Sequence, residues 1–282
     1  MREPRHVRGS CGCRVILVMP EKLVAALHPA RLSSYESEWA RLAGVSPTSV
    51  SRPAVAALYV WQVSLGSAWY ETLAFTEAIV RNALDLSLRA WNIREGRSED
   101  WLEDSSAPLA GLVAQSAKRS RQRATQAVLK RSAWHSRHGV IVSLDDRVAQ
   151  LDFGSICFLL PQDAPARRAT NGSGFTGREN LWLHATRSAF PLLSADFTRG
   201  WQGQLSPGVP VSVQNAYAAG HALERLRRLR NRIGHHEQTF RVDHARRLRD
   251  VTLLVRSISS GAADELEALD RVRRTLAMRP RP

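Results

Sequence analysis

A short arginine-rich stretch at residues 226–237 combines residue types that can cleave RNA without a metal. Within it, Arg230 and Asn231 are followed by His235. Cleavage through the ribose 2′-OH needs a base for that hydroxyl, a cation for the phosphorane and an acid for the leaving 5′-oxygen. Histidine suits the proton steps because it ordinarily titrates near neutrality. Arginine suits the phosphate because it stays charged and donates two parallel hydrogen bonds. We therefore expect His235 to act as base or acid and Arg230 to bind the phosphate.

The spacing of these residues limits how they can meet. Asn231 precedes His235 by four positions, so in a continuous helix both lie on one face, and Asn231 could orient the imidazole or contact the phosphate. Arg230 precedes His235 by five positions, which is about 140° around an ideal helix. Either the helix distorts near Gly234, or the site forms where two copies of the motif meet.

The residues that follow the motif are candidates for supporting roles. His236 is either a second active-site residue or a support for the first, and Glu237 is a further supporting candidate. Adjacent histidines on a helix diverge by about 100° and therefore make a poor chelate. We expect no metal and no other cofactor.

Apolar residues at helical spacing predict the elements that position the motif. Steps of three and four from Leu58 to Ile79 predict a helix from 54 to about 91, and a second pattern predicts the motif's own helix at 212–234. A strand-like pattern occurs only at 140–143. Further helices are predicted at 109–136, 144–160, 180–190, 242–257 and 264–278. The predicted fold class is all-α.

A second cluster of polar residues lies on the first long helix. Glu77 and Arg81 are one turn apart in the favourable order, and Asn82 follows. One interpretation is an ordinary surface ion pair, worth about 0.3–0.5 kcal/mol. The other places them beside the motif's helix, with Glu77 orienting an arginine or histidine there.

The charge of the chain points to a polyanionic partner, with nucleic acid first and an anionic membrane surface second. Its 282 residues hold 40 Lys and Arg against 26 Asp and Glu, a formal net charge of +14. The basic side chains are either an RNA-binding surface or a solvated helix face. The candidates for RNA binding are Lys118, Arg119, Arg121, Arg123, Arg227, Arg228 and Arg232.

The number of cysteines and the hydropathy pattern indicate the environment in which we expect the chain to work. Cys11, Cys13 and Cys157 are too few and odd in number for a disulfide framework, so we expect a reducing, cytoplasmic environment. No apolar run approaches the roughly 18 residues that span a bilayer, and we expect no membrane partner.

The motif resembles the Arg-Asn-x-x-x-His signature of HEPN ribonucleases, and residues 226–237 resemble the C-terminal motif of the Abi-like (abortive infection) bacterial family. Other blocks of the sequence are similar to that family in the same order, over roughly 29–245. They are LSSY at 32–35, ALYVW at 57–61, SL at 64–65, ExxxRNAL at 77–84, AQLDFG at 149–154, LW at 181–182 and AFP at 189–191.

The resemblance implies a HEPN-like helical bundle with additional helices. It further implies a homodimer with a shared cleft and a metal-independent RNA endonuclease, acting in phage defence or as a toxin. The alternative is a non-catalytic protein that scaffolds a small RNA. We expect a basic N-terminal extension at 1–28, either disordered or, up to residue 18, upstream of a start at Met19. The helical domain is expected at 29–260, with a C-terminal helix and basic tail at 261–282.

Overall fold

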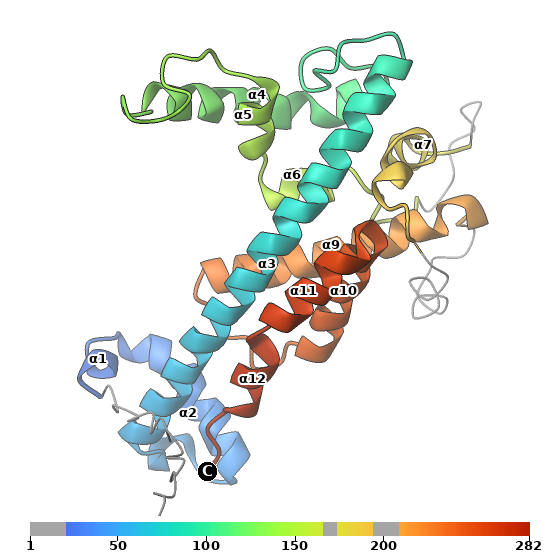
Figure 1. Ribbon diagram of the computed structural model, residues 1–282. Coiled ribbons are helices and arrows are strands. Elements are labelled where there is room, and N and C mark those ends of the chain that lie inside the picture. Colours follow the sequence, from blue (N-terminus) through green and yellow to red (C-terminus); the bar gives the residue numbers. More distant parts are fainter. Residues whose placement is uncertain (1–20, 166–173, 194–208) are drawn as a thin grey trace, which may run out of the picture. The chain divides into compact units, whose positions relative to one another are not determined.

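The computed structural model describes residues 21–165, 174–193 and 209–282, and within them the chain is helical with no strand. The expected all-α class is therefore confirmed for this part of the chain (Figure 1). Expectations for Cys11, Cys13 and the start at Met19 lie outside the described residues. No helix in the described ranges is long and apolar enough to cross a bilayer.

Contacts divide the chain into two units. The first contains residues up to Ser64 together with Thr275–Pro282, and the second contains Leu65–Arg274. These limits differ from the expected boundaries at 28 and 260. The long helix α3 (Arg52–Arg94) contributes to both units, and so does α12 (Val272–Ala277).

The first unit is built from short helices and the beginning of α3. It contains α1 (Glu21–Ala25), α2 (Pro29–Ala43) and the 3-10 helix η1 (Pro47–Ser49). The end of the chain belongs to this unit, because the indole of Trp61 donates a hydrogen bond of 2.7 Å to the carbonyl of Thr275.

The second unit holds the remaining elements. They are α4 (Leu109–Leu129), α5 (Leu144–Ala149), α6 (Phe153–Cys157), α7 (Gly177–His184), the 3-10 helix η2 (Thr186–Ala189), α9 (Val211–Gly234), α10 (His244–Ile258) and α11 (Ser260–Leu269). Helix α9 is central, since it contacts α6, α7 and α10. At Gly220 a Cβ atom would lie 2.1 Å from the carbonyl oxygen of Pro161, so only glycine allows this close approach.

The predicted long helix is confirmed as α3, but part of the face predicted to be buried is exposed. Leu58, Leu65 and Ala68 are buried as expected, whereas Phe75 is 47% exposed. Thr76 and Val80 are fully buried instead. The buried row continues from Ala68 in steps of four, which follow an inclined ridge of the helix rather than a line parallel to its axis.

Several predicted helices are shorter than expected. The helix predicted at 109–136 ends at Leu129, and 140–143 forms no strand. The loop after Leu129 satisfies its own polar groups: Arg131 donates to the carbonyl of Arg137 at 3.2 Å. The helix predicted at 144–160 divides into α5 and α6, because Asp152 accepts a hydrogen bond from the Ser155 amide at 2.8 Å and starts a new helix.

Two other predicted helices are also divided. The segment predicted at 180–190 forms α7 followed by η2, and the one predicted at 264–278 forms α11 and α12 with a break at Asp270. The carboxylate of Asp270 accepts a hydrogen bond from the Val272 amide at 2.8 Å, which marks the new start. The motif's helix is confirmed as α9.

Candidate active site

Helix α9 presents the arginine-rich motif because one of its faces is apolar. Leu226 and Leu229 are buried, at 0% and 2% exposure. Because these leucines are buried, the residues between them lie at the edge of the buried face of α9 or in solvent. The Arg228 side chain, for example, is 74% exposed. The half-buried Arg230 lies at this edge.

The end of α9 forms a closed turn with an unusual backbone. The amide of His236 donates to the carbonyl of Ile233 at 3.0 Å, and the amide of Glu237 donates to the carbonyl of Arg232 at 2.8 Å. This is the Schellman pattern, in which the residue at the position of His236 adopts a left-handed conformation. His236 has φ 54°, and it is the only residue other than glycine with a positive φ among those the structure describes.

A helix distortion near Gly234 was one of the two alternatives, and the left-handed residue occurs two residues later, at His236. Gly234 is still helical, and the His235 amide donates to the carbonyl of Asn231 at 2.9 Å. A left-handed residue other than glycine costs about 1 kcal/mol or more, and such residues cluster at functional sites. The strain falls at His236 rather than at Gly234.

The side chains of this turn face solvent. His235, His236 and Glu237 are exposed, and Glu237 closes the turn through an ion pair of 3.1 Å with Arg232. Asn231 is half-buried, and within the described chain its amide makes no hydrogen bond to the His235 ring. The structure thus presents His235 to solvent without the orienting contact that the spacing allowed.

The side chains of Glu77 and Arg81 on α3 are mostly buried. Their side chains are 18% and 21% exposed, and Arg81 Nη1 lies 3.6 Å from Glu77 Oε1. Burial raises the pKa of the Glu77 carboxyl, although the charges of Arg81 and Arg230 act in the opposite direction. The pair is therefore not an ordinary surface ion pair, and the structure brings Glu77 of α3 into the field of Arg230 of α9.

The other polar residues singled out on α3 have different environments. Arg81 Nη1 donates to the carbonyl of Leu151 at 3.5 Å, which connects α3 to the segment before α6. Asn82 is exposed, and within the described ranges its side chain makes no hydrogen bond to a motif residue. The structure therefore assigns Arg81, but not Asn82, to the group around Glu77.

Asp152 is a site residue that the sequence prediction missed. Its carboxylate lies 3.7 Å from Arg123 of α4. Burial alone would raise its pKa, but hydrogen bonds from Ser155 and the charges of Arg119 and Arg123 outweigh burial and lower it. Asp152 also acts on Glu77, so it connects α4 with the group around Arg230. The signal in the sequence was its helix-capping position within the AQLDFG block.

Glu224 is the second missed residue, and it restrains two of the predicted RNA-binding arginines. Arg227 Nε lies 2.6 Å and Arg228 Nε 2.8 Å from its carboxylate. The hydrogen bond from Arg227 lowers the pKa of the Glu224 carboxyl further than burial raises it. The i, i+3 and i, i+4 spacing in the sequence could have identified this cluster.

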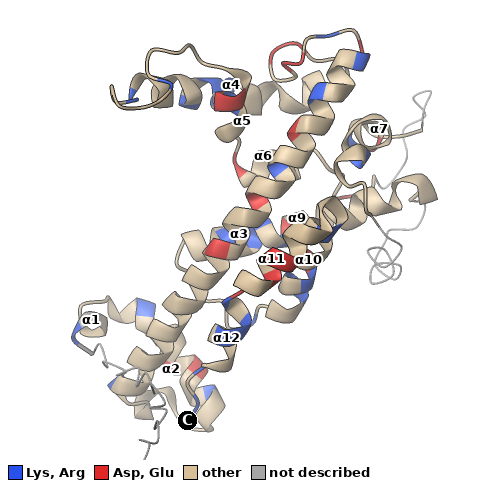
Figure 2. Ribbon diagram, viewed as in Figure 1, with Lys and Arg blue, Asp and Glu red and all other residues tan. Residues whose placement is uncertain are grey.

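Helix α4 supplies the other predicted cations, and Lys and Arg gather along it (Figure 2). Lys118 and Arg119 are exposed. Arg121 forms an ion pair with Glu103, and Arg123 pairs with Asp152. The structure therefore connects the basic face of α4 to the motif through Asp152.

His244 and Cys157 have structural surroundings. His244 accepts a hydrogen bond of 3.0 Å from the indole of Trp69, against which it also stacks. Cys157 is buried, and burial raises the pKa of its thiol. No group of three His, Cys, Asp or Glu in the described ranges could hold a metal ion.

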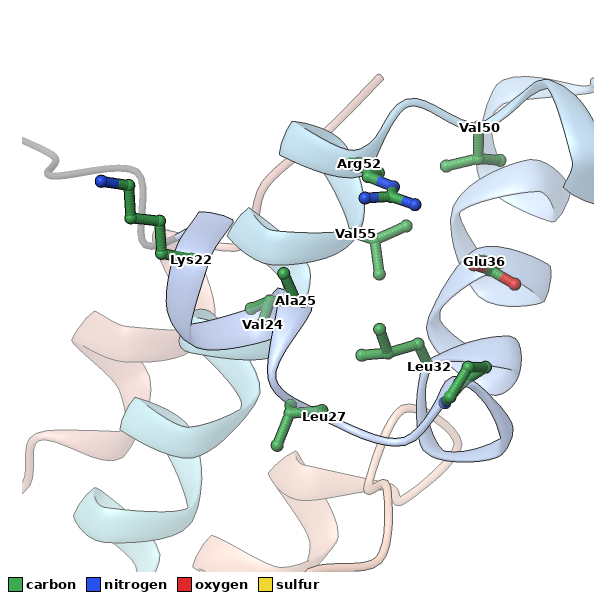
Figure 3. Close-up of a pocket in the computed structure, with 10 residues that line it drawn as sticks. Lys22, Val24, Ala25, Leu27, Leu32, Glu36, Val50, Arg52 and Val55 are labelled. Carbon is green, nitrogen blue, oxygen red and sulfur yellow. The ribbon is translucent and has the colours of Figure 1, made fainter.

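The first unit has a hollow of its own, with a volume of about 370 Å³ (Figure 3). Val24, Leu27 and Leu32 line it together with Lys22 and Arg52. None of the residues predicted to cleave or bind RNA contributes to this hollow.

Comparison of the chain with models of protein families, with curated proteins and with solved structures gives no match in any of the three.

Proposed function

We propose that the chain is a metal-independent RNA endonuclease of the HEPN type. The observation that carries the proposal is the arrangement around the end of α9. The charge of Arg230 acts on Glu77 in the half-buried pair of Glu77 and Arg81. The exposed His235 follows five residues later and directly precedes the left-handed His236. A cation for a phosphate and an imidazole for protons thus lie five residues apart in the chain, and the imidazole is accessible to a large ligand.

The chemistry follows from these groups. His235, as base, takes the proton from a ribose 2′-OH, and the resulting alkoxide attacks the adjacent phosphorus. Arg230 stabilises the charge on the equatorial phosphoryl oxygens. The bond from phosphorus to the 5′-oxygen breaks, and that oxygen receives a proton. The products are a 2′,3′-cyclic phosphate and a 5′-OH.

The acid in this scheme is a second histidine. His236 is the nearest candidate in the chain, and His235 of a second copy is the alternative. The second arrangement matches the homodimer with a shared cleft that the resemblance implies. It also accounts for an exposed His235 that makes no hydrogen bond to Asn231.

Charge supports RNA as the substrate. Exposed cations lie at the end of α9, with Arg228 and Arg232, and on α4, with Lys118 and Arg119. A chain with a net charge of +14 attracts any phosphodiester, but only RNA has the 2′-OH that the scheme requires. The resemblance adds phage defence or a toxin as the proposed biological role.

The test is RNA cleavage by the purified chain in EDTA, with wild type beside His235→Ala and with the product ends mapped. We expect cyclic phosphate ends from wild type and a loss of at least about a hundredfold in the variant. Because His235 is exposed, the fold of the variant should be intact, and circular dichroism checks this.

The contrary result is equally clear. Cleavage that persists in His235→Ala, or that requires a divalent cation, contradicts the proposal. Salt-dependent RNA binding of equal strength by both proteins, without turnover, supports a protein that scaffolds an RNA. The matched control is His184→Ala, an exposed histidine at the end of α7, which should cleave RNA as wild type does.

A further inference from the structure

A second hollow lies in the larger unit, between the end of α4 and α5, and no role has been given to it above. Its volume is about 420 Å³. Ala127 and Val128 of α4 form an apolar wall, and Lys130, Arg131 and His135 supply polar and cationic groups. An apolar wall beside cations fits a ligand with a flat apolar part and an anionic part.

The base of this hollow is a buried ion cluster with an excess of positive charge. Asp146, whose side chain is 9% exposed, pairs with Arg131 at 2.5 Å and with Arg137 at 3.0 Å. Two guanidinium groups therefore share one carboxylate. Lys130, which lines the hollow, has no ion-pair partner within the described ranges. The hollow thus has positive charge available for an anion, and Asp146 fixes the position of Arg131.

The loop that lines the hollow also carries an unusual tryptophan. Trp134, which directly precedes His135, is 97% exposed, whereas Trp61, Trp69, Trp101 and Trp182 are buried. An exposed indole forgoes the free energy that burial provides, and both faces of its ring are open to a ligand. Aromatic side chains among cations are how proteins hold unpaired nucleotides, with bases stacked on the rings and phosphates bound by the cations.

We propose that Trp134 and this hollow bind unpaired nucleotides of an RNA strand, with a base stacked on the indole and a phosphate bound by Lys130, next to the positive charge of Arg131. This rests on the proposed function for the identity of the ligand, and it adds a grip on the strand away from the site of cleavage. Helix α4 connects the two places, because Arg123 on the same helix pairs with Asp152 beside the group around Arg230. A duplex does not fit the proposal, since its bases are already stacked on one another.

The test is binding of an unstructured, fluorescently labelled 12-nucleotide RNA, measured by anisotropy in EDTA. All proteins carry His235→Ala, so that cleavage does not remove the probe. Trp134→Ala should weaken binding about tenfold, and Trp134→Phe should restore most of the affinity because the ring is retained. Lys130→Gln should weaken binding and lower the slope of log Kd against log salt by about one.

The matched controls alter the same residue types elsewhere. Tyr70→Ala removes a 61% exposed aromatic side chain from α3, and Arg274→Gln removes an exposed cation from α12. Neither control variant should weaken RNA binding as Trp134→Ala or Lys130→Gln does. A 5-bromouridine in the RNA should form a photo-crosslink to the peptide that contains Trp134.

The outcomes separate this inference from the proposed endonuclease. Unchanged affinity in both Trp134→Ala and Lys130→Gln overturns the inference, even if wild type cleaves RNA. Selective loss of binding in these variants supports it, even if wild type proves unable to cleave. Equal binding of the matching duplex, or equal displacement of the RNA by polyglutamate, also overturns it, because the site would then recognise charge alone.

Discussion

Glu38 in the smaller unit and Glu77 in the larger one have the same kind of neighbours but different bonding. Each lies on a helix and faces two arginines, one of them a turn further along that helix. Glu38 accepts hydrogen bonds from Arg41 at 2.9 and 2.8 Å and from Arg279 at 2.6 Å. Arg81 approaches Glu77 only to 3.6 Å, and in the described chain the Glu77 carboxylate accepts no hydrogen bond.

The pKa values of the two carboxyl groups are shifted in opposite directions. Hydrogen bonds from Arg41 lower the pKa of Glu38 despite its burial. Burial raises the pKa of Glu77 despite Arg81 and Arg230. A carboxylate saturated with hydrogen bonds fixes its arginines in place, as a structural ion pair does. An unsaturated one holds arginines nearby while leaving their donors available to a phosphate, and this is the difference expected between a structural cluster and a site.

The largest expected effect tests the role of the unsaturated cluster. Glu77→Gln removes the charge that positions Arg81 and Arg230, so RNA cleavage should fall by about tenfold to a hundredfold. The melting temperature at neutral pH should not fall, because the variant no longer buries a carboxylate that lacks hydrogen bonds. Initial cleavage rates and thermal unfolding measure the two quantities.

The control for this variant is Glu71→Gln on the same helix. Glu71 forms a more exposed ion pair of 3.3 Å with Arg271, and its replacement should leave cleavage unchanged. A large loss of stability in Glu77→Gln with unchanged cleavage would mean that this cluster is structural after all.

The second prediction concerns stability and pH. Glu38→Gln should lower the melting temperature by about 5 °C at neutral pH, through the loss of charged hydrogen bonds, without changing cleavage. Because the folded-state pKa of Glu38 is lowered, its contribution is present above the ordinary glutamate pKa and is lost as pH falls through the lowered value. Glu38→Gln should therefore lose less stability on acidification than wild type does.

Glu77 has the opposite sign. Its folded-state pKa is raised, so its contribution is present below the ordinary glutamate pKa and is lost as pH rises through the raised value. Glu77→Gln should gain stability relative to wild type as pH rises through that window. Chemical denaturation of both variants from pH 3 to 8 tests the pair, and parallel pH profiles would remove the contrast. Glu36→Gln on α2 is the control.

The smallest expected effects come from replacing the left-handed residues at the ends of α2 and α9. Helix α2 ends at Gly44 with φ 69°, whereas the left-handed residue after α9 is His236 with φ 54°. Gly44→Ala should lower the free energy of unfolding by about 1 kcal/mol, because space for the Cβ is open and only the backbone opposes it. His236→Gly should raise it by up to about 1 kcal/mol.

Cleavage provides the functional half of this comparison. If His236 is the acid in the proposed scheme, His236→Gly becomes more stable but cleaves RNA more slowly, whereas Gly44→Ala cleaves normally. His236→Gly with full activity would show that the strain has no role in cleavage. Denaturant midpoints and single-turnover rates are the measurements.

The helical class and the two helices that carry the candidate site follow from the amino-acid pattern alone. The 3.6-residue pattern is strong in both, and the confirmed α3 and α9 reflect it. The same pattern failed where a single capping residue decides: Asp152 and Asp270 start new helices inside apolar periodicity that continues through them. Helical periodicity is judged over many residues, so it does not register a capping hydrogen bond that spans only three.

Tertiary structure alone decided which charges matter. Glu77 and Arg230 are far apart in the chain, and only the packing of α3 with α9 places one in the field of the other. The sequence could not tell that Glu38 would be saturated and Glu77 not, because the second arginine of each cluster comes from a distant segment. The left-handed turn was also hidden, since glycine at 234 is the residue that favours it, yet the backbone places it at His236. Local periodicity follows from local sequence, whereas burial and charge pairing depend on neighbours that the folded chain supplies.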